Sequence, residues 1–291
     1  MPEGDTIFRA ARTLHRALAG KTVTRFESVY PAVTRMAEDR GVVGRTIESV
    51  GSRGKHLLMT LSGDLVLHTH MRMNGSWHLY PAGGRWQRPA RDMRILVATA
   101  DAVAVGFNVP VVELLSRRDL ARHRDLSALG PDLLDAVGDR SAQSQRRSVP
   151  EEVIPRMRAR GREAIGDVLL NQRVVAGIGN VFKSEILFEA GIDPFTPVEG
   201  LSDAALQRVL DIARNQLSAN VIDRSQTLVR SAGRRTTRSL DPDARLWVYA
   251  RGGRPCRRCG TSIRAQKTGV DARLTYWCPR CQPPVQFRIQ N

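Results

Sequence analysis

Lysine, cysteine and long apolar runs are all scarce in this 291-residue chain. Only four residues are lysine, so arginine supplies nearly all of the positive charge, and chemistry that needs a lysine amine has few candidates. No apolar run reaches about 18 residues, which excludes a membrane-spanning helix. No signal-like apolar stretch stands at the start. We therefore expect a cytoplasmic protein whose four cysteines are not in disulfides.

The charge balance is strongly basic. Lysine and arginine number 45 against 29 acidic residues, which leaves a net charge of +16 and a pI near 11.0. Because this charge is spread along a globular sequence, it favours a polyanionic partner, most simply nucleic acid. A ribosome-like basic protein or general solubility charge is the alternative. Arginine suits bidentate phosphate contacts, although a coding bias would produce the same excess.

The chain begins Met-Pro-Glu-Gly-Asp. A small second residue usually allows removal of Met1, and Pro2 would then carry a free secondary amine with a pKa of about 8. Such an amine attacks aldehyde carbons and forms an iminium ion, and Glu3 beside it could exchange protons. Many proteins begin Met-Pro by chance, so this pattern needs support from the rest of the chain.

The hydrophobic pattern predicts an α+β fold. Residues 6–19 read as an amphipathic helix capped by Asp5 and ended by Gly20. From about 22 to 115, short alternating β-branched runs are separated by turn signals, which indicates an antiparallel sandwich or barrel. Beyond a polar, basic linker the pattern turns helical, and Ser202 caps an expected helix over 203–219.

All four cysteines belong to two Cys-x-x-Cys pairs. Cys256 and Cys259 are followed after eighteen residues by Cys278 and Cys281. Four thiolates at this spacing can surround one structural Zn²⁺, and a redox pair is the alternative. The segment between the pairs has the length of a β-hairpin. Its basic residues suggest a nucleic-acid contact, or else simply solvated charges on a zinc-stabilised end.

A glycine-rich turn interrupts the helical region. Gly177-Ile178-Gly179-Asn180 reads as a tight turn between two helices, with Asn180 as the cap of the second helix. Free amide groups at that helix start can bind a phosphate without reading sequence. A plain packed turn is the alternative.

These three separated features occur together and in order, and the combination resembles the family of bacterial formamidopyrimidine-DNA glycosylase and endonuclease VIII over essentially the whole chain. The resemblance implies removal of oxidised bases followed by strand cleavage through β,δ-elimination. Pro2 matches the nucleophile and Glu3 the acid that protonates the sugar ring oxygen. Lys55 matches a catalytic-site lysine that contacts phosphate near the lesion.

The resemblance also implies a set of DNA-binding residues. Asn180 matches the turn asparagine that grips the backbone, and Lys183 on the same helix is a further candidate contact. Arg273 matches the hairpin arginine at the flipped nucleotide. Met73 is the candidate for the methionine that wedges into the duplex, with an ordinary core methionine as the alternative.

Within this family the chain resembles the endonuclease VIII branch more than the formamidopyrimidine branch, and the endonuclease VIII branch prefers oxidised pyrimidines. The stretch 108–113 lacks the Arg and Phe with which the formamidopyrimidine branch probes the opposite base. Two departures from the family pattern bear on efficiency: Thr6 replaces a carboxylate, and Asn171 stands where the family usually has Asp.

We therefore predict an N-terminal β-sandwich catalytic domain with a leading helix over 1–135, a linker over 136–155, a helix-two-turn-helix domain over 156–250 and a zinc finger over 251–291. The expected protein is a DNA glycosylase and lyase with one structural zinc ion. It would act as a bacterial, nucleoid-associated cytoplasmic monomer on double-stranded DNA with oxidised bases or abasic sites. The alternatives are a non-catalytic damaged-DNA-binding relative and an 8-oxoguanine-type glycosylase.

Overall fold

The computed structural model describes residues 2–134, 150–221, 233–269 and 272–284. These residues divide into two compact units, one ending at Ala128 and the other beginning at Leu129, and each is described by itself. Residues 135–149, which include most of the predicted linker over 136–155, lie outside the described part of the chain, as do the last residues of the predicted zinc finger. No helix in the described part is long and apolar enough to cross a membrane.

Unit 1 is an antiparallel β-sandwich with a helix at its start, as the sequence predicts. One sheet has the strand order β1-β6-β7-β5 and the other the order β2-β3-β4-β8. Side chains from both sheets share one apolar core. The strands are β1 (Arg25–Ser28), β2 (Ile47–Arg53), β3 (His56–Leu61), β4 (Leu65–His70), β5 (Ser76–Pro81), β6 (Met93–Ala98), β7 (Ala102–Phe107) and β8 (Val111–Ser116).

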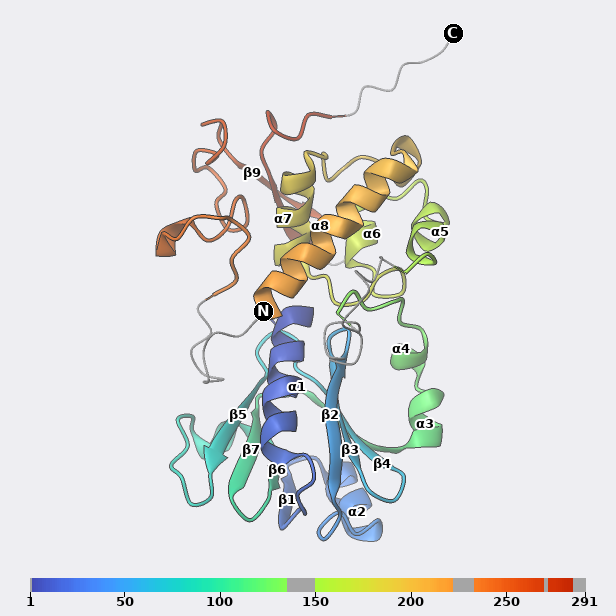
Figure 1. Ribbon diagram of the computed structural model, residues 1–291, viewed down its shortest axis with the longest axis vertical. Coiled ribbons are helices and arrows are strands. Elements are labelled where there is room, and N and C mark those ends of the chain that lie inside the picture. The colour runs from blue at the N-terminus through green and yellow to red at the C-terminus, as the bar shows by residue number, and fades with distance from the viewer. Residues whose placement is uncertain (1, 135–149, 222–232, 270–271, 285–291) are drawn as a thin grey trace, which may run out of the picture. The chain divides into compact units, whose positions relative to one another are not determined.

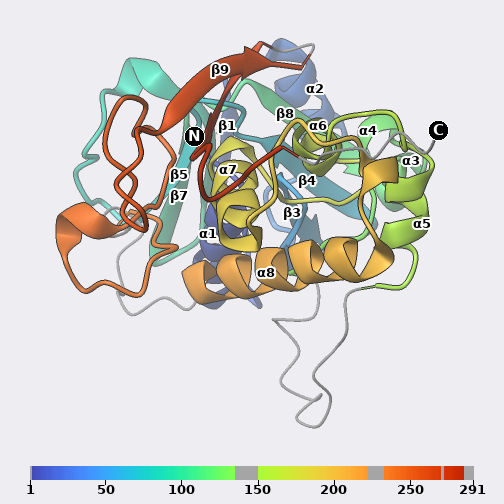
Figure 2. The ribbon, with the colours of Figure 1, turned by 90° about the horizontal axis from the view of Figure 1, so that it is seen from above.

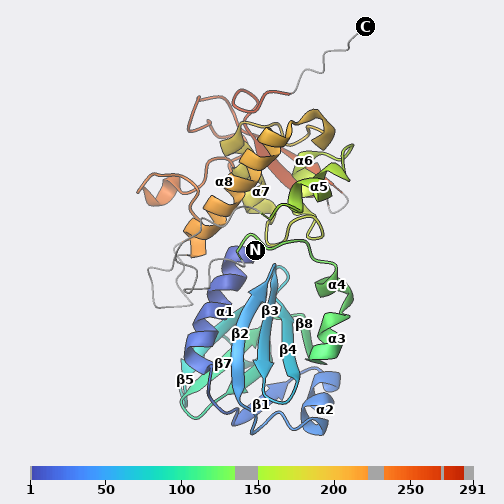
Figure 3. The same ribbon diagram turned by 45° about the vertical axis from the view of Figure 1, so that its right-hand side comes forward.

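The first helix, α1 (Gly4–Leu18), packs along β2 and contributes one apolar face to the core (Figures 1 and 3). Ile7, Leu14 and Leu18 are fully buried at helical spacing. The predicted cap is wrong. Glu3, not Asp5, occupies the N-cap position, because its carbonyl accepts the first helical hydrogen bonds, and Asp5 lies within the first turn. The remaining helices of unit 1 are α2 (Pro31–Asp39), η1 (Ala90–Asp92), α3 (Arg117–Ala121) and α4 (Arg124–Ser127).

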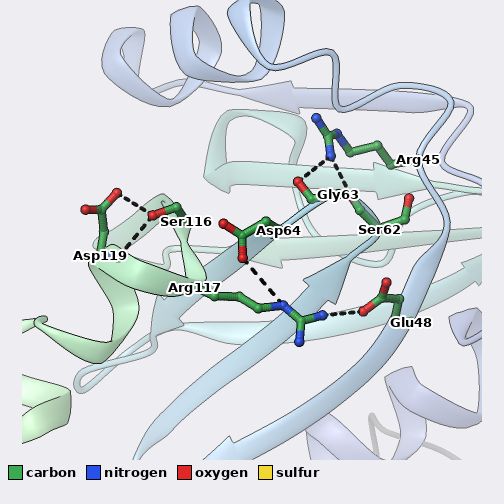
Figure 4. Close-up of polar contacts among 8 residues, drawn as sticks. All are labelled: Arg45, Glu48, Ser62, Gly63, Asp64, Ser116, Arg117 and Asp119. Atoms are coloured by element: carbon green, nitrogen blue, oxygen red, sulfur yellow. Dashed lines mark hydrogen bonds and ion pairs between the residues drawn. The ribbon is translucent and has the colours of Figure 1, made fainter.

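Polar contacts at one end of the second sheet fasten α3 to the strands (Figure 4). Ser116 caps α3 by accepting a hydrogen bond from the Asp119 amide at 3.0 Å. Arg117 then reaches Glu48 at 2.6 Å and Asp64 at 3.7 Å. Pairs this exposed contribute at most about 1 kcal/mol each. Their role is to direct the chain after β8 along the edge of the sheet, where α3 and α4 lie in Figure 3.

Unit 2 combines helices with a two-stranded hairpin. The long helix α8 lies beside α7 (Figure 2), and α7 also contacts the hairpin. Val153 and Met157 are buried one turn apart, so helical structure begins at Val153, inside the range expected to be linker. Ser202 accepts a hydrogen bond from the Ala205 amide and starts α8 where predicted. The elements are α5 (Val153–Arg158), α6 (Ile165–Leu170), α7 (Asn180–Ala190), η2 (Val198–Gly200), α8 (Asp203–Val221), η3 (Pro242–Ala244), β9 (Arg264–Thr268) and β10 (Arg273–Trp277).

Candidate active site and metal centre

Pro2 and Glu3 lie at the N-terminal end of α1. Pro2 is half-buried, whereas the Glu3 side chain is fully buried. The Glu3 carbonyl accepts hydrogen bonds from the amides of Thr6 at 2.9 Å and Ile7 at 3.1 Å, which fixes the backbone beside Pro2. The positive pole of the helix dipole also lies at this end. A protected carboxyl group therefore stands next to the residue that would carry the free amine. Met1 itself is outside the described residues.

Beside Thr6, the first turn of α1 also holds the carboxylate of Asp5. Asp5 is fully buried and pairs with Arg9 at 3.5 Å. The Thr6 hydroxyl donates to the Asp5 carboxylate at 3.2 Å. Asp5 thus interacts with Thr6 and Arg9, and Glu3 is the carboxyl group directly beside Pro2 in the chain.

Lys55 occupies the tip of the β2–β3 hairpin. Gly54 precedes it with a φ of +58°, which a two-residue hairpin turn requires. The Lys55 charge lies close enough to His70, at the end of β4, to affect its titration. Burial lowers the pKa of His70 to about 4, and the charges of Arg72 and Lys55 act in the same direction. His70 is therefore a neutral neighbour of Lys55 at physiological pH.

Met73 lies in the loop between β4 and β5. It is 59% exposed, whereas Met71 in the same loop is part of the core. A Cβ at Gly75 would lie 2.6 Å from the Met71 carbonyl oxygen, so only glycine permits this tight return of the chain. The loop therefore presents Met73 to solvent, and the alternative that Met73 is an ordinary core residue is wrong.

A histidine cluster lies in the same unit. It consists of His56, His68, His70, His123 and Glu113, and its rings contact one another at centroid distances of 4.6 to 5.2 Å. Burial is the main cause that lowers the pKa of His56 to about 2. Sequence reasoning missed this cluster, because only the antiparallel register places His68 directly opposite Glu113.

In unit 2 the glycine turn joins α6 to α7 as predicted, and a glutamine holds it closed. Gln172 donates from Nε2 to the carbonyls of Leu170 at 2.8 Å and Ile178 at 3.0 Å. Its Oε1 accepts a hydrogen bond from the Gly177 amide at 3.1 Å. Gly177 has a φ of +94°, a conformation that favours glycine. Gln172 was not among the predicted site residues.

Asn180 and Lys183 connect α7 to the hairpin. Gly179, not Asn180, is the N-cap of α7, so the predicted capping role is wrong. Asn180 instead donates from Nδ2 to the Leu274 carbonyl at 2.8 Å, and its Oδ1 has no hydrogen-bond partner among the described residues. Lys183 is fully buried and donates to the Thr275 hydroxyl at 2.6 Å. This burial argues against the expected phosphate contact by Lys183.

Glu185 joins the same helix to the segment that leads into the cysteines. Its carboxylate accepts hydrogen bonds from the amides of Trp247, Val248 and Tyr249 at 2.8 to 2.9 Å and from the Thr236 hydroxyl. Burial raises the pKa of Glu185 even though these hydrogen bonds favour the charged form. Glu185 was not among the predicted site residues, since its partners lie 51 to 64 residues later in the chain.

The four cysteines converge as a metal centre requires. All four Sγ atoms lie within 4.8 Å of one another, with Cys256 to Cys281 at 3.9 Å and Cys259 to Cys278 at 3.5 Å. A tetrahedral zinc with bonds of about 2.3 Å needs sulfur–sulfur distances of about 3.8 Å. The Arg258 amide also donates to the Cys256 sulfur at 3.4 Å. The site therefore fits one structural zinc ion with no open coordination position.

Three domain families match successive parts of the chain. Residues 1–110 match the formamidopyrimidine-DNA glycosylase N-terminal domain, and residues 143–231 match the helix-two-turn-helix domain of the same glycosylase. Residues 253–284 match a zinc finger found in this glycosylase and in isoleucyl-tRNA synthetase. A protein named "Probable endonuclease 8 2" from Streptomyces coelicolor is 42% identical over 285 residues, which cover 97% of this chain and 94% of that protein. The chain belongs to the formamidopyrimidine-DNA glycosylase and endonuclease VIII family.

Further relatives place this family member among the endonuclease VIII proteins. A protein named "DNA-(apurinic or apyrimidinic site) lyase Nei2" from Mycolicibacterium smegmatis is 37% identical and is matched over 97% of this chain and 99% of its own length. Among solved structures, Lactococcus lactis formamidopyrimidine-DNA glycosylase in complex with abasic-site DNA has a TM-score of 0.76 at 22% identity, and the match covers 97% of this chain and 100% of that chain. The structural likeness supports the fold.

Proposed function

We propose that this family member is a bifunctional DNA glycosylase and apurinic/apyrimidinic lyase of base excision repair. The observation that carries the proposal is the half-buried Pro2 beside the buried carboxyl group of Glu3 at the start of α1. The names of the relatives and the net charge of +16 support the same activity on double-stranded DNA. The protein would act as a monomer in the bacterial cytoplasm, at the nucleoid.

In this proposal the amine of Pro2, freed by removal of Met1, attacks C1′ of the damaged nucleotide. The bond from C1′ to the base breaks and the base leaves. Glu3 protonates the sugar ring oxygen, so the ring opens, and the amine loses its single proton to become an iminium cation. The cation draws electrons from the sugar, so a C2′ proton is lost and the 3′ phosphate leaves by β-elimination. The 5′ phosphate then leaves by δ-elimination.

Each unit supplies candidate DNA contacts. The damaged nucleotide must leave the base stack before C1′ can be reached. In unit 1, the exposed Met73 fills the vacated space, and Lys55 binds a phosphate near the lesion. In unit 2, Asn180 at the start of α7 and Arg273 at the start of β10 bind backbone phosphates. Lys183 is left out of this set because its ammonium group is buried.

Oxidised pyrimidines are the proposed substrates. Support comes from the stretch 108–113, which lacks the Arg and Phe of the formamidopyrimidine branch and forms the entry into β8. The endonuclease 8 names of the relatives agree with this choice. Excision of 8-oxoguanine or formamidopyrimidine more efficiently than thymine glycol or 5-hydroxycytosine would assign the chain to the other branch.

Borohydride trapping tests the proposal directly, because borohydride reduces an iminium to a permanent crosslink. Protein with Met1 removed, verified by mass spectrometry, is incubated with a duplex that holds one abasic site. We expect a crosslink at the processed N-terminus that is lost or greatly weakened in Pro2→Gly. Glu3→Gln should strongly reduce excision of an oxidised pyrimidine. Pro89→Gly, in the loop before η1, is the matched control and should crosslink like the wild type.

Failure has a defined meaning. If zinc-loaded protein without Met1 binds damaged duplex but forms no crosslink, the lyase mechanism is refuted. The result would favour a non-catalytic damaged-DNA-binding protein.

A further inference from the structure

Four of the six histidines of the chain meet in the histidine cluster of unit 1. Neither the iminium chemistry nor the cysteine zinc centre uses His68, His123 or Glu113. The three side chains come from β4, the α3–α4 turn and β8, and they bring one ligand atom each to within 4.8 Å of the others.

We propose that His68, Glu113 and His123 form a second metal site that binds a divalent transition-metal ion such as Zn²⁺. The ligand atoms are His68 Nδ1, His123 Nε2 and the Glu113 carboxylate. Two imidazoles and one carboxylate can bind zinc and other divalent first-row transition metals, and three protein ligands leave a coordination position for water. The site therefore differs from the cysteine centre in donor type and in having an open position.

The sheet preorganises two of the three ligands. His68 and Glu113 are cross-strand partners in the β4–β8 register, and His68 Nδ1 lies 2.8 Å from Glu113 Oε2. His123 Nε2 reaches the same oxygen at 3.1 Å. The His68 side chain is nearly completely buried, whereas Glu113 is 40% and His123 17% exposed. An ion can thus enter from the Glu113 side and meet a ligand held by the sheet.

The hydrogen bonds can rearrange at small cost when an ion binds. In the absence of an ion, the Glu113 carboxylate accepts hydrogen bonds from His68 Nδ1–H and His123 Nε2–H. Binding to His68 Nδ1 moves its proton to Nε2, which lies 2.8 Å from His56 Nδ1. The His68 Nε2–H group then donates a hydrogen bond to His56 Nδ1, and His56 carries its own proton on Nε2. Such a hydrogen bond from a metal-ligating histidine to a group behind it is common. His123 exchanges its Nε2–H hydrogen bond to Glu113 for the bond to the ion, and with its proton on Nδ1 it also loses the long 3.4 Å hydrogen bond from the Leu126 amide.

A second carboxylate adds to the attraction for a cation. Asp125, on α4, lies near enough to act electrostatically on His68. The charges of Glu113 and Asp125 together offset the positive charge of the ion, which the neutral imidazoles cannot do. The two carboxylates therefore favour binding of a divalent cation at this place, although the chain as a whole is strongly basic.

The test uses the full-length protein with zinc already in the cysteine centre. Zn²⁺ is added, the protein is dialysed and the bound metal is counted, and the affinity is measured by calorimetry. We expect a second ion in the wild type, and an affinity at least about tenfold weaker in Glu113→Gln and in His123→Ala. His78→Ala is the matched control, because His78 bonds Ser76 and Tyr80 outside the cluster, and it should bind like the wild type.

Two further measurements test which side chains hold the second ion. His56→Phe keeps a ring but removes the acceptor behind His68, and we expect an affinity about 10- to 100-fold weaker. Co²⁺ added to the zinc-loaded protein should show ligand-field absorption without a thiolate charge-transfer band. A wild type that retains no second ion, variants that bind like the wild type, or a thiolate band from Co²⁺ would each overturn the proposal. His123→Ala changes a residue on a surface turn, so it keeps the test valid if Glu113→Gln fails to fold.

Discussion

Removing the Glu185 carboxylate should destabilise unit 2 by a calculable amount. Glu185→Ala leaves three backbone amides, those of residues 247–249, without their acceptor. A buried donor without a partner costs about 1–3 kcal/mol, and two of these amides are only partly buried, so about 1 kcal/mol each is appropriate. We therefore expect a loss of at least about 3 kcal/mol in the free energy of unfolding.

Glu185→Gln refines the prediction, because the amide keeps the shape and one acceptor oxygen. Its carbonyl can serve the amides of Val248 and Tyr249, and the Thr236 hydroxyl can rotate to accept from the new NH₂ group. Only the Trp247 amide then loses its partner, so the loss should be about 1–2 kcal/mol. The two substitutions thus differ by the number of amides that they leave unsatisfied.

Native-state hydrogen exchange of zinc-loaded protein measures the effect where it arises. The amides of 247–249 should exchange faster in both variants, with the larger change in Glu185→Ala. Glu163→Ala, which removes a half-exposed carboxylate paired with Arg160, is the control and should change stability by less than about 0.5 kcal/mol. A loss below about 1 kcal/mol for Glu185→Ala, or equal losses for the two variants, would refute the reasoning.

Four other outcomes are expected. If about six phosphates are neutralised, the log–log dependence of DNA affinity on salt should have a slope of about −5, and a slope near zero would contradict a basic DNA surface. Burial raises the pKa of Asp193, so its contribution to stability is complete below the ordinary pKa and is lost as pH rises through the folded pKa. Asp193→Asn keeps the acceptor for the Phe195 amide. In urea titrations the free energy of unfolding of Asp193→Asn should therefore match that of the wild type at about pH 3 and exceed it at pH 7. A wild type that is more stable than Asp193→Asn at pH 7 would contradict this prediction. Cys259→Ser should reduce zinc in the cysteine centre and weaken DNA binding, as metal analysis and a binding titration would reveal, whereas unchanged zinc content would exclude Cys259 as a ligand. Met73→Ala should slow excision from duplex DNA more than it changes stability, and equal excision rates would dismiss the wedge.

Local patterns were sufficient for much of the fold and of the candidate site. The β-branched and alternating runs of residues 56–61 and 94–98 correspond to β3 and to most of β6, because the composition of a strand is a property of a short stretch. Burial alternates along part of β3, whereas β6 is buried at four successive residues, as a short apolar run between turns allows. The cysteine spacing predicts the zinc centre for the same reason, since each Cys-x-x-Cys pair forms its half of the site by itself. The turn at Gly177 also follows from residues that are adjacent in the chain.

Roles that depend on a distant partner were misjudged. Asn180 is a residue type that often caps helices, but its side chain instead donates a hydrogen bond to the Leu274 carbonyl. Lys183 was expected at the surface as a DNA contact, yet its side chain is buried and donates a hydrogen bond to the Thr275 hydroxyl. In both cases the competing partner belongs to β10, more than ninety residues later in the chain.

The amino-acid sequence by itself determined the family, the zinc ligands, the Pro2-Glu3 pair and the order of a β-rich region followed by a helical one. Each of these depends on the identity and spacing of residues that are close in the chain or occur in a fixed order. Only the tertiary structure decided that Met73 is exposed, that Glu185 holds three amides, and that His68 faces Glu113 beside His123. Burial and hydrogen-bond partnership are set by strand register and packing, which bring together residues that local spacing leaves unrelated.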